Sequence, residues 1–328
     1  MTTSRNRKSR ERTKSTMAGL LMTAMLLFLT PIQTACAEPV EEMSRDGSKE
    51  RPLRVMLIPA DTGADTTLDD FKPVFKAIEA NFGIYFDLRV GTSYHAVVEG
   101  LATKRVEIAF VGPVAFHQAL QRNAAELLAV GISDNVSSYR AVLLTRADSG
   151  IKNLGDLKGK NLALGDINSA SSFQFPLAML VKAKIDPILG LGKVTVTGSH
   201  SSALAALREG YVDAAGCSLN ALEKAINSHV VANGQLVILA VSPPIPNPPL
   251  VMHPALAADV KEKLRDAFRT IHHTPGVTPE MIRGYGGRQY ERFDVEFSQK
   301  EFEEAVQKLA PVTQEMVTCI VERAADRK

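Results

Sequence analysis

From Leu53 onward, short apolar runs alternate with segments of helical periodicity, and this alternation limits the folds open to the chain. Nine apolar runs fit strands: Leu53–Ile58, Phe86–Val90, Glu107–Val111, Leu127–Ile132, Arg140–Thr145, Asn161–Leu164, Val194–Thr197, Val212–Cys217 and Leu236–Val241. Six segments between them fit helices: Asp70–Asn81, Ala96–Thr103, Phe116–Arg122, Phe173–Ala183, Ser202–Arg208 and Ala221–Ser228. Strands that alternate with helices pair in parallel, so the pattern predicts an α/β protein with mostly parallel sheets.

The C-terminal part differs from the rest, because its pattern predicts helices without intervening strands. We expect helices over Ala257–Ile271 and Gln299–Arg327, and Pro311 should interrupt the second of them. Before the first predicted strand, the polar residues 38–51 predict a flexible lead-in.

Two segments of the chain are similar to each other, GTSYHAVVEGLATKRVEIA at 91–109 and TGSHSSALAALREGYVDAA at 197–215. In this alignment Ser93 matches Ser199 and Tyr94 matches His200. The match indicates two related lobes, although two unrelated αβ units can show such similarity by chance. Ligands of open α/β sheets bind beyond the carboxyl ends of strands, so the two matching loops would face each other across a cleft.

The chain must cross between two such lobes, and two segments are candidates for the crossings. The first is SSYRAVLLTR at 137–146, and the second is the Pro-rich VILAVSPPIPNPP at 237–249, which is rigid and has few backbone donors. The predicted organisation is lobe one over 52–142 plus 243–295, lobe two over 143–242, and C-terminal helices over 296–328.

The N-terminus has the pattern of an export signal. Six basic residues precede an apolar core at Ala18–Leu29, and Ala35-Cys36-Ala37 resembles a cleavage site, so residues 1–37 would be removed. The apolar run is shorter than the roughly 20 residues that span a bilayer. A retained anchor helix and lipidation at Cys36 are the alternatives, although Gln33-Thr34-Ala35 lacks the Leu of a lipoprotein box. We expect a periplasmic protein exported by a Sec-type signal peptide.

Charge and cysteine content exclude several classes of function. The leader carries six of the 38 basic and one of the 36 acidic residues, which leaves 32 basic and 35 acidic residues, a charge of −3. Such a chain has no broad attraction for nucleic acid. The sequence has no CxxC or HExxH pattern, so no metal site is expected. Cys217 and Cys319 either form a disulfide or remain two buried thiols.

Hydroxyl and amide side chains cluster where a strand meets a helix, in the stretch Gly165–Ser172. The helix is expected to start near Ser171 or Ser172, with Pro176 in its first turn. Free N–H groups and the positive end of the helix dipole would face this loop, so it suits a tetrahedral or carboxylate anion. Simple helix capping needs only one Ser or Asn and remains the alternative.

Four further residues have polar side chains in places that could reach a ligand. His200 begins the helix after Val194–Thr197 and can donate to an anion, Tyr94 occupies the matching place in lobe one, and Tyr139 adjoins the first crossing. Asn220 follows the strand Val212–Cys217. Surface or core positions for His200 and the tyrosines, and a capping role for Asn220, are the alternatives.

From about Arg54 to Asp294 the chain resembles the periplasmic phosphonate/phosphite/phosphate-binding proteins of ABC importers. The family pattern of a strand, Asp-x-x-Ser-Thr-Ser-Gly and a helix with an early Pro appears here as Asp166–Ser172 with Pro176. Similar stretches include TSYHAVVEGL, VEIAFVGP, the SSYRAVLLTRADSGIKNLGDLKGKNLALGD segment, TGSHSSALAALREGYVDAA and SPPIPNPPLV. The resemblance implies a two-lobed type II periplasmic-binding-protein fold whose hinge has two crossings.

The resemblance also implies roles for single residues. Ser169, Ala170 and Ser171, with nearby N–H groups, would hold ligand oxygens; His200 would donate to the same group; and Tyr94 and Tyr139 would close the pocket. The family's Thr is Ala170 here, which removes one hydroxyl. Family members that prefer an amino-bearing ligand have Glu where this chain has Asn220, and Asp where it has Asn247 or Pro248. These differences argue against 2-aminoethylphosphonate, and also against phosphite.

Three classes of function remain distinct at this point. The first is a monomeric binding protein that delivers a phosphonate- or phosphate-like oxyanion to an inner-membrane ABC permease, without a cofactor. The second is a sensory partner of a membrane histidine kinase, for example for arsenite if Cys217 faces the cleft. The third is an enzyme with a triad of Ser171, His200 and Asp213; the Gly-x-Ser-x-Gly elbow of such hydrolases is missing, and we expect no enzyme.

Overall fold

The computed structural model describes residues 43–59, 64–284 and 287–325. The predicted signal peptide, its cleavage site and the lipidation alternative at Cys36 lie outside the described residues. Residues 43–51 belong to the expected lead-in and are bonded to later parts of the chain. The Met43 N–H donates to the Ala255 carbonyl at 2.8 Å, and the Tyr85 N–H donates to the Gly47 carbonyl at 2.8 Å. In the described part of the chain, no helix is both long and apolar enough to cross a membrane.

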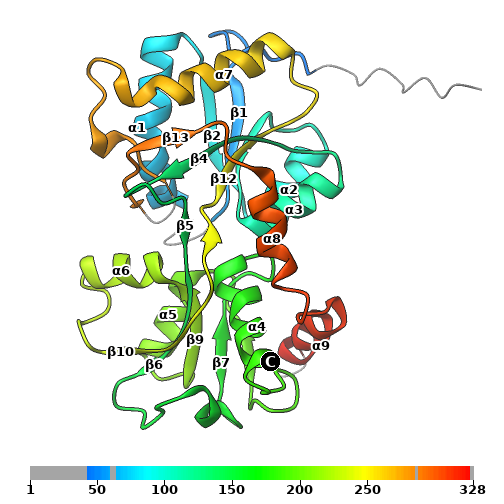
Figure 1. The fold of residues 1–328 in the computed structure, drawn as a ribbon, viewed down its shortest axis with the longest axis vertical. Helices are drawn as coiled ribbons and strands as arrows, with labels where there is room; N and C mark the ends of the chain where they lie inside the picture. The colour runs from blue at the N-terminus through cyan, green and yellow to red at the C-terminus, as the bar shows by residue number, and fades with distance from the viewer. Residues whose placement is uncertain (1–42, 60–63, 285–286, 326–328) are drawn as a thin grey trace, which may run out of the picture. The chain divides into compact units, whose positions relative to one another are not determined.

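The first of two main sheets has six strands in the order β13-β4-β12-β3-β1-β2 (Figure 1). Its strands are β1 (Leu53–Leu57), β2 (Phe86–Val90), β3 (Ile108–Phe110), β4 (Glu126–Ile132), β12 (Pro249–Met252) and β13 (Arg292–Asp294). The helices of this region are α1 (Ala64–Phe82), α2 (Tyr94–Ala102), α3 (Pro113–Gln121) and α7 (Ala258–Thr270), with short turns η3 (Ile271–His273) and η4 (Pro279–Met281). We call this sheet with its helices the first lobe.

The strands of the first lobe follow the predicted parallel αβ pattern near the N-terminus and depart from it later. β1 pairs in parallel with both β2 and β3, whereas β12 runs antiparallel between β3 and β4. One hydrophobic core unites the lobe, and aromatic edge contacts such as Phe75–Phe268, with ring centroids 5.9 Å apart, join α1 to α7. Edge-to-face contacts add to the energy of burying the rings.

The second sheet has five strands in the order β10-β6-β9-β7-β8. Its elements are β6 (Ala141–Arg146), η1 (Leu154–Leu157), β7 (Leu162–Leu164), η2 (Ala170–Gln174), α4 (Phe175–Lys182), β8 (Val194–Val196), α5 (His200–Arg208), β9 (Ala214–Ser218), α6 (Leu219–Asn227) and β10 (Leu236–Val241). β7 is parallel to β8 and β9, and β6 is antiparallel to β9 and β10. We call this sheet with its helices the second lobe, and its hydrophobic residues form two clusters.

The two predicted crossings meet as a small sheet of their own. β5 (Ser138–Tyr139) pairs antiparallel with β11 (Ile245–Pro246), so Ile245 lies opposite Tyr139. The chain passes from β4 of the first lobe through β5 to β6 of the second, and it returns from β10 through β11 to β12. Both candidate segments therefore contain the crossings. The lobe boundaries expected above stay predictions at the level of single residues.

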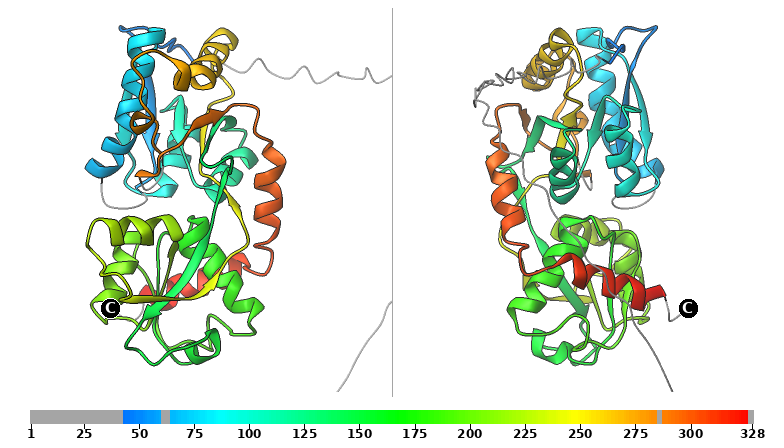
Figure 2. Two further views of the ribbon diagram at one scale, coloured as in Figure 1. Left: turned by 60° about the vertical axis from the view of Figure 1, so that its left-hand side comes forward. Right: turned by 90° about the vertical axis from the view of Figure 1, so that its right-hand side faces the viewer.

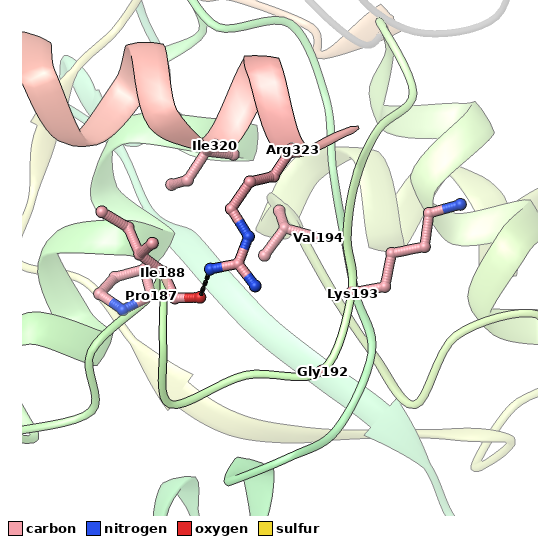
Figure 3. Close-up of a pocket in the computed structure, with 7 residues that line it drawn as sticks. All are labelled: Pro187, Ile188, Gly192, Lys193, Val194, Ile320 and Arg323. Carbon is pink, nitrogen blue, oxygen red and sulfur yellow. Dashed lines mark hydrogen bonds between the residues drawn. The ribbon is translucent and has the colours of Figure 1, made fainter. Parts of the chain in front are cut away.

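The C-terminal helices form a third connection between the two lobes, which the sequence did not predict. α8 (Gln299–Gln307) packs on the first lobe, where Phe302 contacts Phe116 of α3 with ring centroids 5.1 Å apart. α9 (Gln314–Ala325) packs on the second lobe, where Val317 and Ile320 join its core (Figure 2). Arg323 of α9 donates to the Ile188 carbonyl, as the close-up in Figure 3 shows. The predicted break at Pro311 falls between the two helices.

The two similar segments have the same local structure. Ser93 caps α2 by accepting a hydrogen bond from Ala96 N–H at 3.1 Å, and Ser199 caps α5 by accepting one from Ser202 N–H at 3.1 Å. Both helices have nine residues, and Tyr94 and His200 are their first residues. Each segment therefore has the expected loop and helix, and the relation between the two lobes stays a prediction.

Several predicted boundaries were wrong, and each has a local cause. The helices predicted from Ala96, Ser202 and Ala221 begin two residues earlier, directly after their serine caps. The helix predicted over Phe173–Ala183 is a π turn over Ala170–Gln174 followed by α4. Strands β5, β11, β12 and β13 were not predicted, because they are short and pair with distant parts of the chain.

Candidate functional site

Three neighbouring parallel strands of the second lobe end at one edge of their sheet, and the predicted site residues follow these ends. The serine loop with Ser169 comes after β7, His200 comes after β8, and Asn220 comes after β9. Carboxyl ends of parallel strands lie together, so the topology brings residues from three separate stretches to one place.

A π turn shapes the serine loop, and Pro176 leaves one carbonyl of the turn open to a partner outside the helix. Gln174 N–H donates to the Ser169 carbonyl at 3.1 Å, and Phe175 N–H donates to the Ala170 carbonyl. Pro176 has no N–H to donate back to Ser172, so the Ser172 carbonyl instead accepts from Gly165 N–H at 3.0 Å. A Cβ on Gly165 would lie 2.1 Å from the Ser172 hydroxyl, so only glycine allows this approach. The helical segment thus begins earlier than predicted, with Ser169 as its cap.

His200 is fixed in one neutral form by its neighbours. Its Nδ1 accepts a hydrogen bond from Ser218 N–H at 3.0 Å, which requires the proton to be on Nε2. Nε2 faces the Ser169 hydroxyl at 3.4 Å, a long contact that a better acceptor could replace. Complete burial lowers the pKa of His200 to about 3, so the ring stays neutral at physiological pH. His200 is therefore a buried, preoriented N–H donor.

The polar groups around His200 are buried and uncharged. Ser169, Ser171 and Ser172 are each at most 2% exposed, and His200 is 1% exposed. Ser169 also accepts from Ser172 N–H at 3.1 Å, as a cap does. Hydroxyls, an imidazole N–H and the end of a helical segment can stabilise an anion through dipoles, without a cationic side chain.

Tyr139 and Ala170 lie in one hydrophobic cluster with Phe175 and Ile245. The crossing strand β5 and the serine loop therefore share this cluster, and the expected role of Tyr139 at the ligand stays a prediction. The methyl group of Ala170 belongs to this apolar contact and is 1% exposed. Ala170 has no side-chain hydroxyl, so only its backbone can donate to a ligand.

Tyr94 contacts the second lobe through its backbone. Burial raises the pKa of the Asp166 carboxyl, whereas hydrogen bonds from the backbone N–H groups of Asn168 and Tyr94 act in the opposite direction. The start of α2 is thus joined to a carboxylate from the loop after β7. A second contact between the lobes is the bond from Gln118 Nε2 to Asn168 Oδ1 at 2.9 Å. The sequence placed Asp166 in the serine motif but did not predict that its carboxylate contacts Tyr94.

Asn220 lies in a large polar cavity and not in the buried serine cluster. The cavity has a volume of about 780 Å³ and is also lined by Tyr139, whereas Ser169, Ser171 and His200 are not among its lining residues. The two regions adjoin, because the Ser218 N–H that holds His200 directly precedes Leu219 and Asn220 of α6. Lys224 of α6 pairs across this cavity with Asp70 of α1 at 3.1 Å.

Asn247 and Cys217, which bear on the choice of ligand, are both buried and held by neighbouring groups. Asn247 is buried, and its side chain donates to the Gly131 carbonyl at 2.8 Å. Cys217 is fully buried in the core beside β6 and α5, and no disulfide joins it to Cys319. The thiol therefore packs as a small hydrophobic group.

The residues of the hypothetical triad do not assemble. Asp213 precedes β9, and its carboxylate accepts from Asn161 N–H at 2.8 Å. His200 lies at the other end of that strand, and its Nδ1 faces Ser218 N–H where a triad would need a carboxylate. Among the described residues, no three His, Cys, Asp or Glu side chains are grouped so that they could hold a metal ion.

Comparison with known proteins agrees with this architecture. Two curated relatives are the phosphonates-binding periplasmic protein of Escherichia coli K12, 28% identical over 79% of this chain and 75% of its own, and the phosphate-import protein PhnD of Mycolicibacterium smegmatis, 29% identical over 66% and 70%. A crystal structure of a binding protein component of an ABC phosphonate transporter from Pseudomonas aeruginosa matches with a TM-score of 0.66 at 20% identity, covering 84% of this chain and 99% of that one. The predicted type II periplasmic-binding-protein fold is therefore confirmed.

The model of one protein family spans most of the described chain. The family is described as ABC transporter, phosphonate, periplasmic substrate-binding protein, and its model matches residues 56–296. The chain belongs to this family of periplasmic substrate-binding proteins of ABC phosphonate transporters.

Proposed function

We propose that this protein binds a small phosphonate- or phosphate-like oxyanion and presents it to an ABC permease of the inner membrane. The observation that carries the proposal is the group of buried neutral donors at the strand ends of the second lobe, formed by Ser169, Ser171 and His200. The curated relatives are named for phosphonate and phosphate, which share a tetrahedral oxyanion head.

In this proposal the oxyanion lies in a cleft between the lobes. Its oxygens accept hydrogen bonds from the hydroxyls of Ser169 and Ser171, from backbone N–H groups at Ala170 and from His200 Nε2. Tyr94 and Tyr139 cover the group from the first lobe and the crossing, and Asn220 borders it. A charged acceptor forms stronger hydrogen bonds than a neutral one, and burial excludes competing water. Ligand that touches both lobes favours the closed arrangement, which the permease can recognise.

The side chains at the cavity argue for a ligand without an amino group. Asn220 and Asn247 are neutral, and Asn247 is already bonded to Gly131, so neither supplies a counter-charge for an ammonium. We therefore expect methylphosphonate to bind better than 2-aminoethylphosphonate.

Thermal unfolding of the purified protein tests the proposal with methylphosphonate, phosphate, phosphite, 2-aminoethylphosphonate and sulfate. A ligand at 100 times its dissociation constant should add about 2.7 kcal/mol of stability. The Ser171→Ala variant should lose the effect, and Ser202→Ala, an exposed serine on α5, should retain it. If no phosphorus oxyanion stabilises the protein, the proposed ligand class is wrong.

A further inference from the structure

The cavity beside the serine cluster is much larger than a methyl group requires. It has a volume of about 780 Å³ and a mostly polar lining. Cavities of this size hold ligands with many atoms. A phosphonate whose oxyanion lies beside His200 would direct its substituent toward this space, because His200 is held by Ser218 and the next residue, Leu219, lines the cavity.

One face of α6 forms a wall of the cavity. Leu219, Asn220, Glu223, Lys224 and Asn227 all line it. These positions recur every three to four residues, so they lie along one side of the helix. The wall begins at the N-terminus of α6, next to the Ser218 that holds His200, and continues along the helix for two turns.

Guanidinium groups also line the cavity. Arg140 at the crossing and Arg283 and Arg288 of the first lobe line it. Among the described residues, none of these three arginines has a carboxylate within ion-pair distance. Arg140 donates to the Ser242 carbonyl, and Arg283 donates to the Glu280 carbonyl. Guanidinium groups bind carboxylates and phosphates with two parallel hydrogen bonds.

Acidic side chains also line the cavity, and they limit the ligand. Asp70 is paired with Lys224 at 3.1 Å, whereas Asp134 and Glu223 line the cavity together with the arginines. A substituent with several anionic groups would be repelled by these two carboxylates. A substituent with one anionic group that is otherwise neutral and polar would be repelled less, and its anionic group can bond to a guanidinium.

We propose that the cavity is a subsite for the organic substituent of the ligand, and that the preferred substrate is a phosphonate or phosphomonoester whose substituent ends in a carboxylate or comparable anionic group. The inference rests on the proposed function, because it takes the oxyanion head to lie at Ser169, Ser171 and His200. It deepens that function by naming the class of substituent.

Calorimetric titration with three phosphonates tests the subsite: methylphosphonate, propylphosphonate and 3-phosphonopropionate. The last two have chains of the same length, and only one of them ends in a carboxylate. We expect 3-phosphonopropionate to bind roughly tenfold tighter than propylphosphonate, because a guanidinium bonded to a carboxylate contributes more than a neutral contact. The advantage should shrink in high salt, since the arginines are partly exposed.

The double variant Arg283→Gln and Arg288→Gln should remove this advantage and leave methylphosphonate affinity unchanged. Arg105→Gln, an exposed arginine of the first lobe outside the cavity, is the matched control and should change neither value. Equal affinity of the two longer ligands, or an advantage that survives in the double variant, would overturn the subsite. If methylphosphonate and the longer ligands all fail to bind, the proposed function fails and the subsite with it.

Discussion

The first turns of α2 and α5 have the same local structure, but the groups that surround them differ in charge. Each has a serine cap that accepts a hydrogen bond at 3.1 Å, and each begins with a polar aromatic residue, Tyr94 or His200. At α2, the backbone N–H of Tyr94 bonds to the carboxylate of Asp166, which comes from the other lobe. At α5, the neighbours of His200 are the neutral groups of Ser169 and Ser218.

Because of this difference in charge, the two similar helix N-termini serve different purposes. A helix N-terminus stabilises a negative charge, and at α2 the protein supplies that charge itself. At α5 the surrounding groups are neutral donors, so a negative charge from a ligand would complete the arrangement. In the proposed function, the start of α5 binds the ligand, and the start of α2 joins the two lobes.

The largest expected effect comes from His200. Replacement by Ala should weaken methylphosphonate binding by about 1–3 kcal/mol, the range for a lost hydrogen bond to a charged group. Tyr94→Phe, which removes one hydroxyl at the matching place in α2, should cost less. Calorimetric titration of both variants gives the comparison. A greater loss in Tyr94→Phe would reverse the assignment of the two helix starts.

The second effect concerns pH. Burial lowers the pKa of His200 to about 3, so the unfolded chain binds a proton below its ordinary pKa while the folded protein does not. Stability from this group is therefore complete above pH 6.5 and is lost as the pH falls toward 3; between pH 7 and pH 5 the loss is about 2 kcal/mol. Urea unfolding at both pH values should show a smaller pH dependence in His200→Gln than in the wild type. An unchanged dependence would mean that His200 does not remain neutral in the folded state.

The two caps should contribute alike to stability. Ser93→Ala and Ser199→Ala should each lower the free energy of unfolding by about 1 kcal/mol, the usual value for a serine cap. Denaturant unfolding measures both losses. A large loss in one variant and none in the other would show that the two segments are not equivalent units.

The smallest effect is expected at Asp166. Asp166→Asn keeps the shape of the side chain and removes its charge from the start of α2, which should cost about 0.3–1 kcal/mol. Because the contact joins the lobes, the cost should appear as weaker ligand binding. Asp148→Asn, an exposed carboxylate of the second lobe, is the control. A loss as large as that of His200→Ala would indicate that Asp166 contacts the ligand.

The sequence predicted the regular part of the fold well, because periodicity is a local property. Strands β2 and β10 match their predicted ranges, and the other seven predicted strands differ by one or two residues at an end. Helices α2, α5 and α6 began two residues earlier than predicted, since the apolar pattern marks the buried face and the cap fixes the start. The short strands β5 and β11 depend on pairing between distant segments, which no local pattern shows.

The site was predictable where residues follow strand ends and unpredictable where lobes meet. Ser169, His200 and Asn220 follow three neighbouring parallel strands, so the alternation of strand and helix was enough to place them at one edge of the sheet. It did not separate Asn220, which lines the cavity, from the buried Ser169 and His200. The contact of Asp166 with Tyr94 and the arginines of the cavity depend on how distant segments pack. The π turn at Ala170–Gln174 was also missed, because the pattern around Pro176 predicts only that a helix begins there.

A crystal structure of the protein with methylphosphonate tests the central assignment most directly. We predict phosphonyl oxygens within hydrogen-bond distance of the Ser169 and Ser171 hydroxyls and of His200 Nε2, with the Asp166 carboxylate still at the start of α2. A phosphonyl group bound at the start of α2, with Asp166 displaced from Tyr94, would contradict it.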